Sequence, residues 1–336
     1  MNFRQSCKKK RKKYFIMLKF VPILHENLKR SVTTVSVYVG TIKKRNYAQQ
    51  VLALLKEYYP FDSSLSHLKR IKETEDKKEL LVIIGKVSLI GNVSCLFKDE
   101  RLQQYIENFI HCFVSDSPPL TRQQFLEASK YWPVQFHESK IMKSIIEGTH
   151  LNEAEIKQGL EFMHLVQDIF STENRSAAVI VNPVDNSILA VAHDHTESDP
   201  LKHAVMVAID TIAWQQNGGA YNLKYRKNDD GFCIIDSNHL LNNLLTLNSK
   251  VYQNLKSGSG GSGYLCTGYD IYLTHEPCVM CSMALLHSRI RRVFFRKSNV
   301  TNGGVQSVFK IHCEESLNHH FEVYKMTLNK RKFEDI

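Results

Sequence analysis

The sequence Pro277-Cys278-Val279-Met280-Cys281 decides the fold of this 336-residue chain. It follows an apolar stretch typical of a strand, Tyr269–Glu276, and begins a stretch typical of a helix, which continues to Ile290. Cysteines three residues apart lie on one face of a helix, so both sulfurs can point at one ion. The partial positive charge of a helix N-terminus favours the thiolate, which is the form that binds metals. The spacing therefore indicates metal or redox chemistry rather than a structural disulfide.

A second stretch, Pro200-Leu201-Lys202-His203, has a related arrangement. Proline is favoured at the first position of a helix, and Asp199 or Ser198 can serve as the N-cap, so a helix is predicted to start here. His203 then lies in the first turn, as the two cysteines do in theirs. One histidine and two cysteines have zinc-like softness and leave a fourth position for water or another group. A C-x-x-C alone is weak evidence, but the proline before each motif favours zinc. The predicted ligands of one Zn²⁺ ion are His203, Cys278 and Cys281.

Together the two stretches resemble the zinc-dependent nucleoside and nucleotide deaminases, whose signature is H-x-E followed by P-C-x-x-C. In that family the metal activates a water that attacks the base, and the glutamate moves protons. The residue at the glutamate position is Val205 here. Valine cannot move a proton, and general acid–base catalysis is worth about 10²–10⁴-fold. We therefore expect this site to bind zinc without deaminating a base.

Two other carboxylates are candidates for the role of the missing glutamate. His195-Thr196-Glu197 spells H-x-E, but it precedes Pro200, in the predicted loop between strand and helix. Asp210 lies seven residues after His203 on the same predicted helix, about two turns further along the axis, which is too far to reach the metal. Neither is expected to transfer protons at the metal.

The valine, together with a basic N-terminal half, resembles one family in particular, the catalytically degenerate third subunit of the eukaryotic heterodimeric tRNA adenosine deaminase. The bridge Leu120–Glu138 and the segment Leu317–Tyr324 resemble the same family, and the resemblance covers residues 117–326 apart from an insert. It implies a three-layer, cytidine-deaminase-like fold and a catalytic partner subunit that supplies the intact site. It also implies that the pair converts adenosine to inosine at the tRNA wobble position, and that this chain supports its partner and binds the tRNA anticodon arm.

The positive charge of the chain lies in its first half. Residues 1–150 contain 26 Lys and Arg against 14 Asp and Glu, whereas residues 151–336 contain 18 against 20. This imbalance indicates a polyanionic ligand, nucleic acid before membrane. Arg289, Arg291 and Arg292 could face tRNA or the partner. The other candidate RNA contacts, each of which a solvated surface would also explain, are Lys29, Arg30, Lys43, Lys44, Arg45, Lys69 and Arg70.

The run Lys8–Lys13 contributes six of these charges and suits an import signal as well as an RNA contact, so we expect the protein in the nucleus and the cytoplasm. We expect no secretory signal peptide, because Lys19 interrupts the apolar stretch Tyr14–Leu24 and no small-residue cleavage site follows. We also expect no membrane span, which needs about 20 predominantly apolar residues.

The chain is predicted to contain two folded domains. The first is a small α+β domain with strands Val32–Val39 and Leu80–Val87 and helices Tyr47–Tyr58 and Glu100–Phe113, for which a ferredoxin-like sandwich is one candidate. The second is an α/β domain with helices on a mixed sheet. The predicted bounds are a disordered basic tail (1–19), the α+β RNA-binding domain (20–115), a docked linker (116–147) and the zinc domain (148–336) with a flexible Gly/Ser-rich insert (217–265).

Two other functions stay open at the level of the sequence. The chain could be a self-sufficient zinc-dependent deaminase of cytidine or adenosine, or a zinc-stabilised RNA-binding module outside the deaminases. Inosine formation by the isolated chain would identify the first. A stable monomer with full RNA affinity would identify the second.

Overall fold

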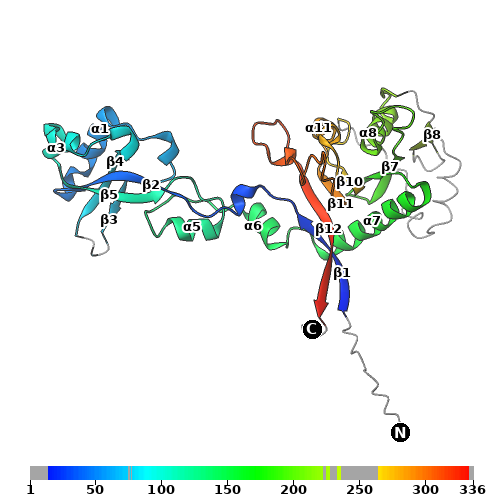
Figure 1. The fold of residues 1–336 in the computed structure, drawn as a ribbon, viewed down its shortest axis with the longest axis horizontal. Helices are drawn as coiled ribbons and strands as arrows, with labels where there is room; N and C mark the ends of the chain where they lie inside the picture. The colour runs from blue at the N-terminus through cyan, green and yellow to red at the C-terminus, as the bar shows by residue number, and fades with distance from the viewer. Residues whose placement is uncertain are drawn as a thin grey trace, which may run out of the picture. The chain divides into compact units, whose positions relative to one another are not determined.

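A computed structural model describes residues 14–74, 76, 78–221, 225–227, 233–235 and 264–332 and divides the chain into two compact units (Figure 1). The larger unit combines the residues up to His25 with those from Ile145 onward, and the smaller unit spans Glu26–Ser144. The run Lys8–Lys13 and most of the insert 217–265 lie outside the described residues. No described helix is long and apolar enough to cross a membrane.

The larger unit is built on an eight-stranded mixed sheet. Its strands, in spatial order, are β1 (Tyr14–Pro22), β12 (Glu322–Lys332), β11 (Arg292–Lys297), β10 (Asp270–His275), β6 (Ala177–Asn182), β7 (Ser187–His193), β9 (Cys233–Ile235) and β8 (Tyr225–Lys227). Strands β10, β11 and β12 are parallel, whereas β6 and β7 form an antiparallel hairpin beside β10. The predicted mixed sheet and its hairpin are confirmed.

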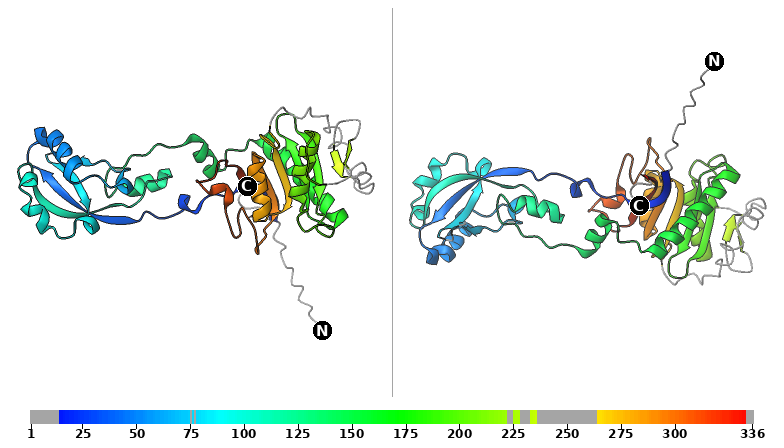
Figure 2. Two further views of the ribbon diagram at one scale, coloured as in Figure 1. Left: turned by 90° about the horizontal axis from the view of Figure 1, so that it is seen from above. Right: turned by 90° about the horizontal axis from the view of Figure 1, so that it is seen from below.

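Helices cover both faces of this sheet (Figures 1 and 2). Helix α7 (Glu153–Glu173) packs on one face, and α8 (Ala204–Gln215) and α11 (Val279–His287) pack on the other. In β10, Ile271 and Leu273 contact the α8/α11 layer, whereas Tyr272 between them packs on Phe162 of α7. Strands buried on both faces are apolar at nearly every position, which is why this region shows no clear alternation. The predicted three-layer α/β arrangement is confirmed.

Strand β1 departs from the sequence prediction, which makes residues 1–19 a tail. The structure places Tyr14–Pro22 antiparallel to β12, with Tyr14 opposite Lys332 and Pro22 opposite Tyr324. Phe20 contributes to the α7 face of the core, and its ring centre lies 4.9 Å from that of Phe294. The strand pairs with a segment about 300 residues away, so nothing in the local sequence identifies its partner.

The smaller unit contains a four-stranded antiparallel sheet in the order β3-β4-β2-β5. Its elements are β2 (Thr34–Ile42), α1 (Ala48–Tyr58), β3 (Ile71–Glu73), β4 (Leu80–Lys86), α2 (Val87–Ile90), α3 (Ser94–Lys98), α4 (Glu100–Gln103), β5 (Ile106–Ser115) and α5 (Arg122–Ala128). Side chains from α1, α3 and α4 lie in one core with one face of the sheet. This chain order and sheet order are those of the ferredoxin-like βαββαβ motif.

The second face of this sheet is covered by residues that the sequence assigns to a linker. Trp132 is 1% exposed, and its indole N–H donates to the carbonyl of Lys69 at 2.6 Å. Ala128 and Val134 join it in one core with Val37, Val39 and Ile83 of the sheet. Residues 116–144 are therefore part of the smaller unit. Both faces of the sheet are therefore covered over their central strands, whereas Ile110 and Phe113 of the edge strand β5 stay 49% and 58% exposed.

The prediction of a helix over Glu100–Phe113 is wrong. Only Glu100–Gln103 is helical, and Ile106–Ser115 forms the edge strand β5. Asn108 has a φ of 52° and lies where the register with β2 shifts, so one extra residue bulges from β5. The bulge sets Ile106 and Phe109, three residues apart, on the same core, and this spacing imitates a helix.

Candidate metal centre

The first ligand, His203, lies at the N-cap of α8 rather than inside its first turn. The helix begins at Ala204, because Asp199 closes a turn over Pro200 instead of capping the helix. Its carboxylate accepts from the N–H of Leu201, and its carbonyl accepts from the N–H of Lys202, each at 3.0 Å. The backbone at His203 is extended, with ψ of 152°, and becomes helical only at the next residue, Ala204.

The two cysteines flank the start of α11. Cys278 is the N-cap residue, and Cys281 lies in the first turn with 2% of its surface exposed. The predicted helix start at Pro277 is thus shifted to Val279. The shift leaves the spacing argument intact, because an N-cap side chain also faces the unpaired N–H groups of the first turn.

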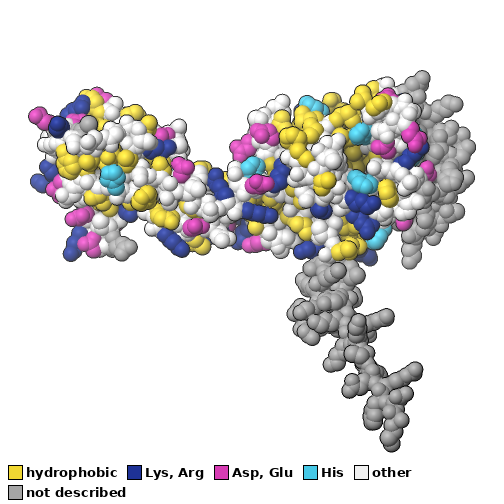
Figure 3. Space-filling view, viewed as in Figure 1, with side chains coloured by type: hydrophobic (Ala, Val, Ile, Leu, Met, Phe, Trp, Pro, Cys, Tyr) yellow, Lys and Arg dark blue, Asp and Glu magenta, His cyan; other side chains and the backbone are white. Residues whose placement is uncertain are grey.

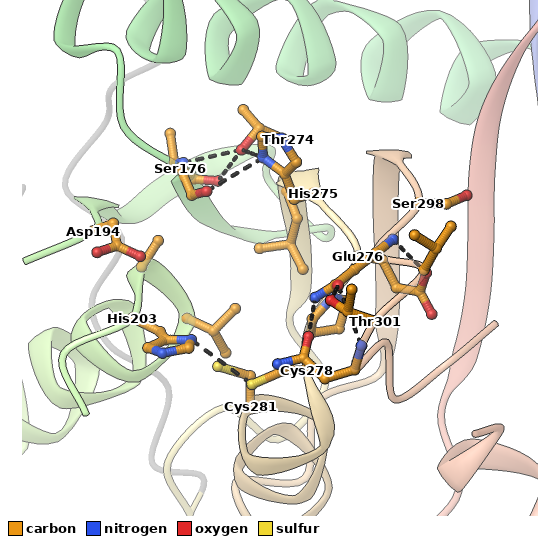
Figure 4. Close-up of a pocket in the computed structure, with 18 residues that line it drawn as sticks. Ser176, Asp194, His203, Thr274, His275, Glu276, Cys278, Cys281, Ser298 and Thr301 are labelled. Atoms are coloured by element: carbon orange, nitrogen blue, oxygen red, sulfur yellow. Dashed lines mark hydrogen bonds between the residues drawn. The ribbon is translucent and has the colours of Figure 1, made fainter. Parts of the chain in front are cut away.

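The structure brings these three side chains together at the ends of two elements that are 75 residues apart in sequence (Figure 4). Their ligand atoms all lie within 4.8 Å of one another, and the Cys278 sulfur is 3.7 Å from His203 Nδ1. Among the described residues, no other group of three His, Cys, Asp or Glu is placed to share a metal ion. The donor set of one imidazole and two sulfurs fits a zinc ion.

The electrostatics of the cluster favour metal binding as well. The thiol of Cys281 and main-chain N–H groups of the first turn of α11 hydrogen-bond to the Cys278 sulfur and lower the pKa of Cys278 to about 5. The same contact, together with burial, raises the pKa of Cys281. These contacts therefore favour the thiolate form of Cys278, which is the form that zinc needs.

A pocket of about 430 Å³ opens beside the cluster, and Val205 is one of the residues that line it. Asp194 and Glu276 are the carboxylates in its wall. Asp194 accepts hydrogen bonds from the N–H and the hydroxyl of Thr196, at 2.8 and 2.5 Å. Glu276 is bonded to the segment 299–307. Both carboxylates therefore accept hydrogen bonds from neighbouring groups, Asp194 through one of its two oxygens.

The alternative carboxylates lie away from the pocket wall. Glu197 is ion-paired with Arg175, and its side chain is 78% exposed. Asp210 is buried, and its carboxylate accepts from the N–H of Ala220 at 2.5 Å, which fixes the chain after α8. Neither the H-x-E frame at His195 nor Asp210 contributes a side chain to the pocket.

Glu276 is the residue of this site that the sequence argument missed. It is 2% exposed and accepts from the N–H groups of Asn299 at 2.9 Å and of Gln306 and Ser307 at 2.7 Å. The hydroxyl of Ser307 also donates to it. A charged residue directly before the P-C-x-x-C, at the end of a buried strand, is the only signal in the sequence that could have indicated it.

Among the predicted RNA-contacting residues, Lys29, Lys43, Lys44, Arg45 and Lys69 are exposed, whereas Arg30 and Arg70 are half-buried. Arg30 donates to the carbonyl of Pro118 at 3.1 Å, Lys43 to that of Gln103 at 2.5 Å, and Arg45 pairs with Glu73 at 2.8 Å. Arg70 is half-buried and donates to the carbonyls of Leu55, Tyr59, Ile83 and Ile84. Its guanidinium thus holds the end of α1 against β4.

Arg292 is also buried and paired with carboxylates of the same unit. It is 4% exposed and pairs with Asp270 at 2.6 Å and with Glu155 of α7 at 2.9 Å. The other two arginines predicted to face tRNA or the partner, Arg289 and Arg291, are exposed.

Comparison with known proteins agrees with this geometry. Residues 158–297 match the cytidine and deoxycytidylate deaminase zinc-binding region. The chain is 34% identical over 325 residues to the "probable inactive tRNA-specific adenosine deaminase-like protein 3" of Danio rerio, covering 91% of this chain and 90% of that protein. It is 29% identical to the human protein of the same name, covering 93% and 90%. It is also 29% identical to the "tRNA-specific adenosine deaminase subunit tad3" of Schizosaccharomyces pombe, covering 88% and 85%. The chain therefore belongs to the family of the tRNA-specific adenosine deaminase subunit TAD3, within the cytidine and deoxycytidylate deaminase superfamily.

Proposed function

We propose that this chain is the non-catalytic subunit of a heterodimeric tRNA adenosine deaminase, which converts adenosine to inosine at the wobble position. The observation that carries the proposal is Val205, a buried apolar side chain at the place of the proton-transferring glutamate, beside an otherwise complete His-Cys-Cys cluster. The relatives named "probable inactive" support the same interpretation.

The residues His203, Cys278 and Cys281 would hold one zinc ion. In an active deaminase this ion activates a water and a glutamate moves the protons, whereas here the residue at the glutamate position is Val205, which cannot move a proton. The ligands come from the starts of α8 and α11, so a bound ion ties these two helices together. The metal in this subunit is therefore structural.

The catalytic subunit would dock beside the cluster. The segment after β11 exposes large apolar side chains, with Val300 at 79%, Phe309 at 53% and Val308 at 47%. Phe309 and Val308 are held by bonds from their N–H groups to the carbonyl of Gly303, next to the pocket. Figure 3 shows hydrophobic side chains gathered over this part of the larger unit, around α11. An ordered apolar surface of this kind is typical of a protein interface.

The smaller unit would bind the tRNA anticodon arm. One face of its sheet packs on helices and the other on residues 128–134, and the edge strand β5 leaves Phe113 58% and Ile110 49% exposed. The exposed Lys29, Lys44 and Lys69 can make contacts with phosphates. Such contacts add affinity and position the RNA without reading its bases.

Reconstitution with purified components tests the proposal. A tRNA with adenosine at the wobble position is incubated with this chain, with the catalytic subunit, or with both, and inosine is measured by sequencing of the product. We expect inosine only with both subunits, which should also co-purify in a 1:1 ratio. Inosine formation by this chain alone, or full activity of the partner alone, would overturn the proposal.

The RNA contacts are tested by comparing Lys44→Ala/Lys69→Ala with Arg70→Ala. The lysine pair should weaken tRNA binding and lower the salt slope of log K by roughly one for each phosphate that is no longer neutralised. Arg70→Ala should instead lower the melting temperature of the protein, because the guanidinium that joins the end of α1 to β4 is lost. An unchanged salt slope in the lysine variant would remove these residues from the interface.

A further inference from the structure

Glu276 is buried next to the His203-Cys278-Cys281 cluster, and its carboxylate accepts hydrogen bonds from one segment, residues 299–307. The partners of Glu276 are the three N–H groups and the hydroxyl of residues 299–307 described above. A carboxylate out of contact with water is costly unless such donors satisfy it. Figure 4 shows the Glu276 side chain turned away from the cluster and bonded to this segment, whereas Cys278 and Cys281 face His203.

The same segment also rests on the residues that carry the sulfurs. The N–H of Gly304 donates to the carbonyl of Pro277 at 2.8 Å, and Gly303 forms a β-bridge with Cys278. A Cβ atom at Gly304 would lie 2.3 Å from the hydroxyl of Ser282 and 3.0 Å from the carbonyl of Cys278. Only glycine allows the segment to approach the start of α11 this closely.

We propose that Glu276 is a positioning residue that couples the order of the segment 299–307 to the occupation of the metal cluster. A metal on Cys278 fixes the main chain on which Gly303 and Gly304 rest. When the segment 299–307 is ordered, it holds Cys278 in the position in which Cys278 can bind the metal. Coupling between two equilibria is reciprocal. Ordering of the segment 299–307 therefore strengthens metal binding by the same factor by which bound metal stabilises the ordered segment.

This coupling gives the non-catalytic metal a role at the surface. Asn299, Val300, Thr301 and Asn302 line the pocket, and Val300 is at the same time the most exposed large apolar side chain of the segment. Metal occupation thereby sets the shape of the surface that the catalytic subunit would contact. The inference rests on the metal site of the proposed function and on no property of tRNA.

The test compares the full-length wild type with Glu276→Gln, Ser307→Ala and a control, Glu155→Gln. Glutamine keeps the size of Glu276 but points an NH₂ group at N–H donors, whereas Ser307→Ala removes a single donor. Glu155→Gln weakens the hydrogen bond to Arg292 in the same unit, remote from the cluster. Zinc affinity is measured by competition with a chromophoric chelator, and hydrogen exchange is followed by mass spectrometry for a peptide covering 299–307.

We expect zinc affinity to fall about 10- to 100-fold in Glu276→Gln, the range seen when groups that orient metal ligands are lost, and to fall less in Ser307→Ala. Glu155→Gln should lower the melting temperature and leave zinc affinity within about twofold. Removal of zinc from the wild type should speed exchange in 299–307 to the rate seen in Glu276→Gln.

Unchanged exchange on zinc removal, or wild-type zinc affinity in Ser307→Ala despite faster exchange, would overturn the coupling. If Glu276→Gln does not fold, the zinc-removal and Ser307→Ala measurements decide alone. None of these measurements involves tRNA or the partner. A failed reconstitution with tRNA would therefore overturn the proposed function and leave this inference standing.

Discussion

Val205 is the residue that, in the proposed function, stands in place of the proton-transferring glutamate of an active deaminase. The three candidate ligands lie together beside a pocket, and Val205 lines that pocket. The two carboxylates that line the pocket are held by Thr196 and by the segment 299–307. The proposed loss of activity therefore depends on one side chain, and the pocket beside the candidate ligands is present.

Val205→Ala should leave the activity of the reconstituted complex within about twofold of wild type, because Val205 takes no part in the chemistry. It should lower stability by about 2 kcal/mol, since two buried methyl groups are lost. Initial rates of inosine formation and urea unfolding curves measure the two effects. A loss of activity of about 100-fold, with the complex intact, would place this pocket in the reaction.

At the scale of elements, two helix starts meet at the candidate metal ligands His203, Cys278 and Cys281. His203 ends the turn that leads into α8, and Cys278 and Cys281 begin α11. Main-chain N–H groups in the first turn of α11 hydrogen-bond to the Cys278 sulfur, whereas α8 has no side chain that caps its N–H groups by a hydrogen bond. A metal ion bound by all three side chains would link the two helix starts.

Cys278→Ala and Cys281→Ala should each lower the zinc content from one ion per chain towards zero and weaken the complex with the catalytic subunit, because metal binding and local folding are coupled. Cys313→Ala is the matched control, since Cys313 is a free cysteine outside the cluster. Metal analysis of the purified variants and size-exclusion chromatography of the complexes give the readout. A variant that keeps its zinc would remove that cysteine from the ligand set.

The turn Ile311–Cys313 is a second link between elements, and it is sensitive to pH. His312 is buried, and its Nε2 lies 2.9 Å from the carbonyl of Ile23, just after β1. Burial lowers the pKa of His312 from 6.5 to about 4, and the nearby cations Lys310, His25 and His320 act in the same direction. The folded protein therefore takes up this proton less readily than the unfolded chain. Stability is lost as the pH falls from about 6.5 towards 4.

At pH 5 this loss should be about 2 kcal/mol. His312→Gln retains an N–H donor for Ile23 and should remove that part of the pH dependence. Urea unfolding at pH 7 and pH 5 for the wild type and the variant provides the measurement. An equal drop in both proteins would show that His312 does not control it.

At the scale of the whole molecule, the smaller unit is an insertion into the larger one. The chain forms β1 first, then the smaller unit, and then returns at Ile145 to build the rest of the sheet. The larger unit thus cannot be completed without residues from before the smaller unit, since β1 covers β12 and adds Phe20 to the α7 core.

Removal of residues 1–13 should leave the melting temperature unchanged, whereas removal of residues 1–22 should lower it strongly or prevent soluble expression. The second deletion leaves β12 as an unpaired edge and exposes apolar core surface. Thermal unfolding of the two truncated proteins makes the comparison. Equal stability of both would show that β1 adds nothing to the larger unit.

The sequence by itself determined the parts of this protein that depend on local spacing. The ligand candidates His203, Cys278 and Cys281, the valine at the glutamate position and the strands next to them follow from motifs of a few residues. Tertiary structure decided what depends on contacts between distant segments: the pairing of β1 with β12, the burial of Arg70 and Arg292, and the hydrogen bonds of Glu276. A side chain's partner far along the chain leaves no mark on the local pattern. The local sequence around a lysine or arginine therefore does not indicate whether its side chain faces solvent or is hydrogen-bonded to a carbonyl or a carboxylate.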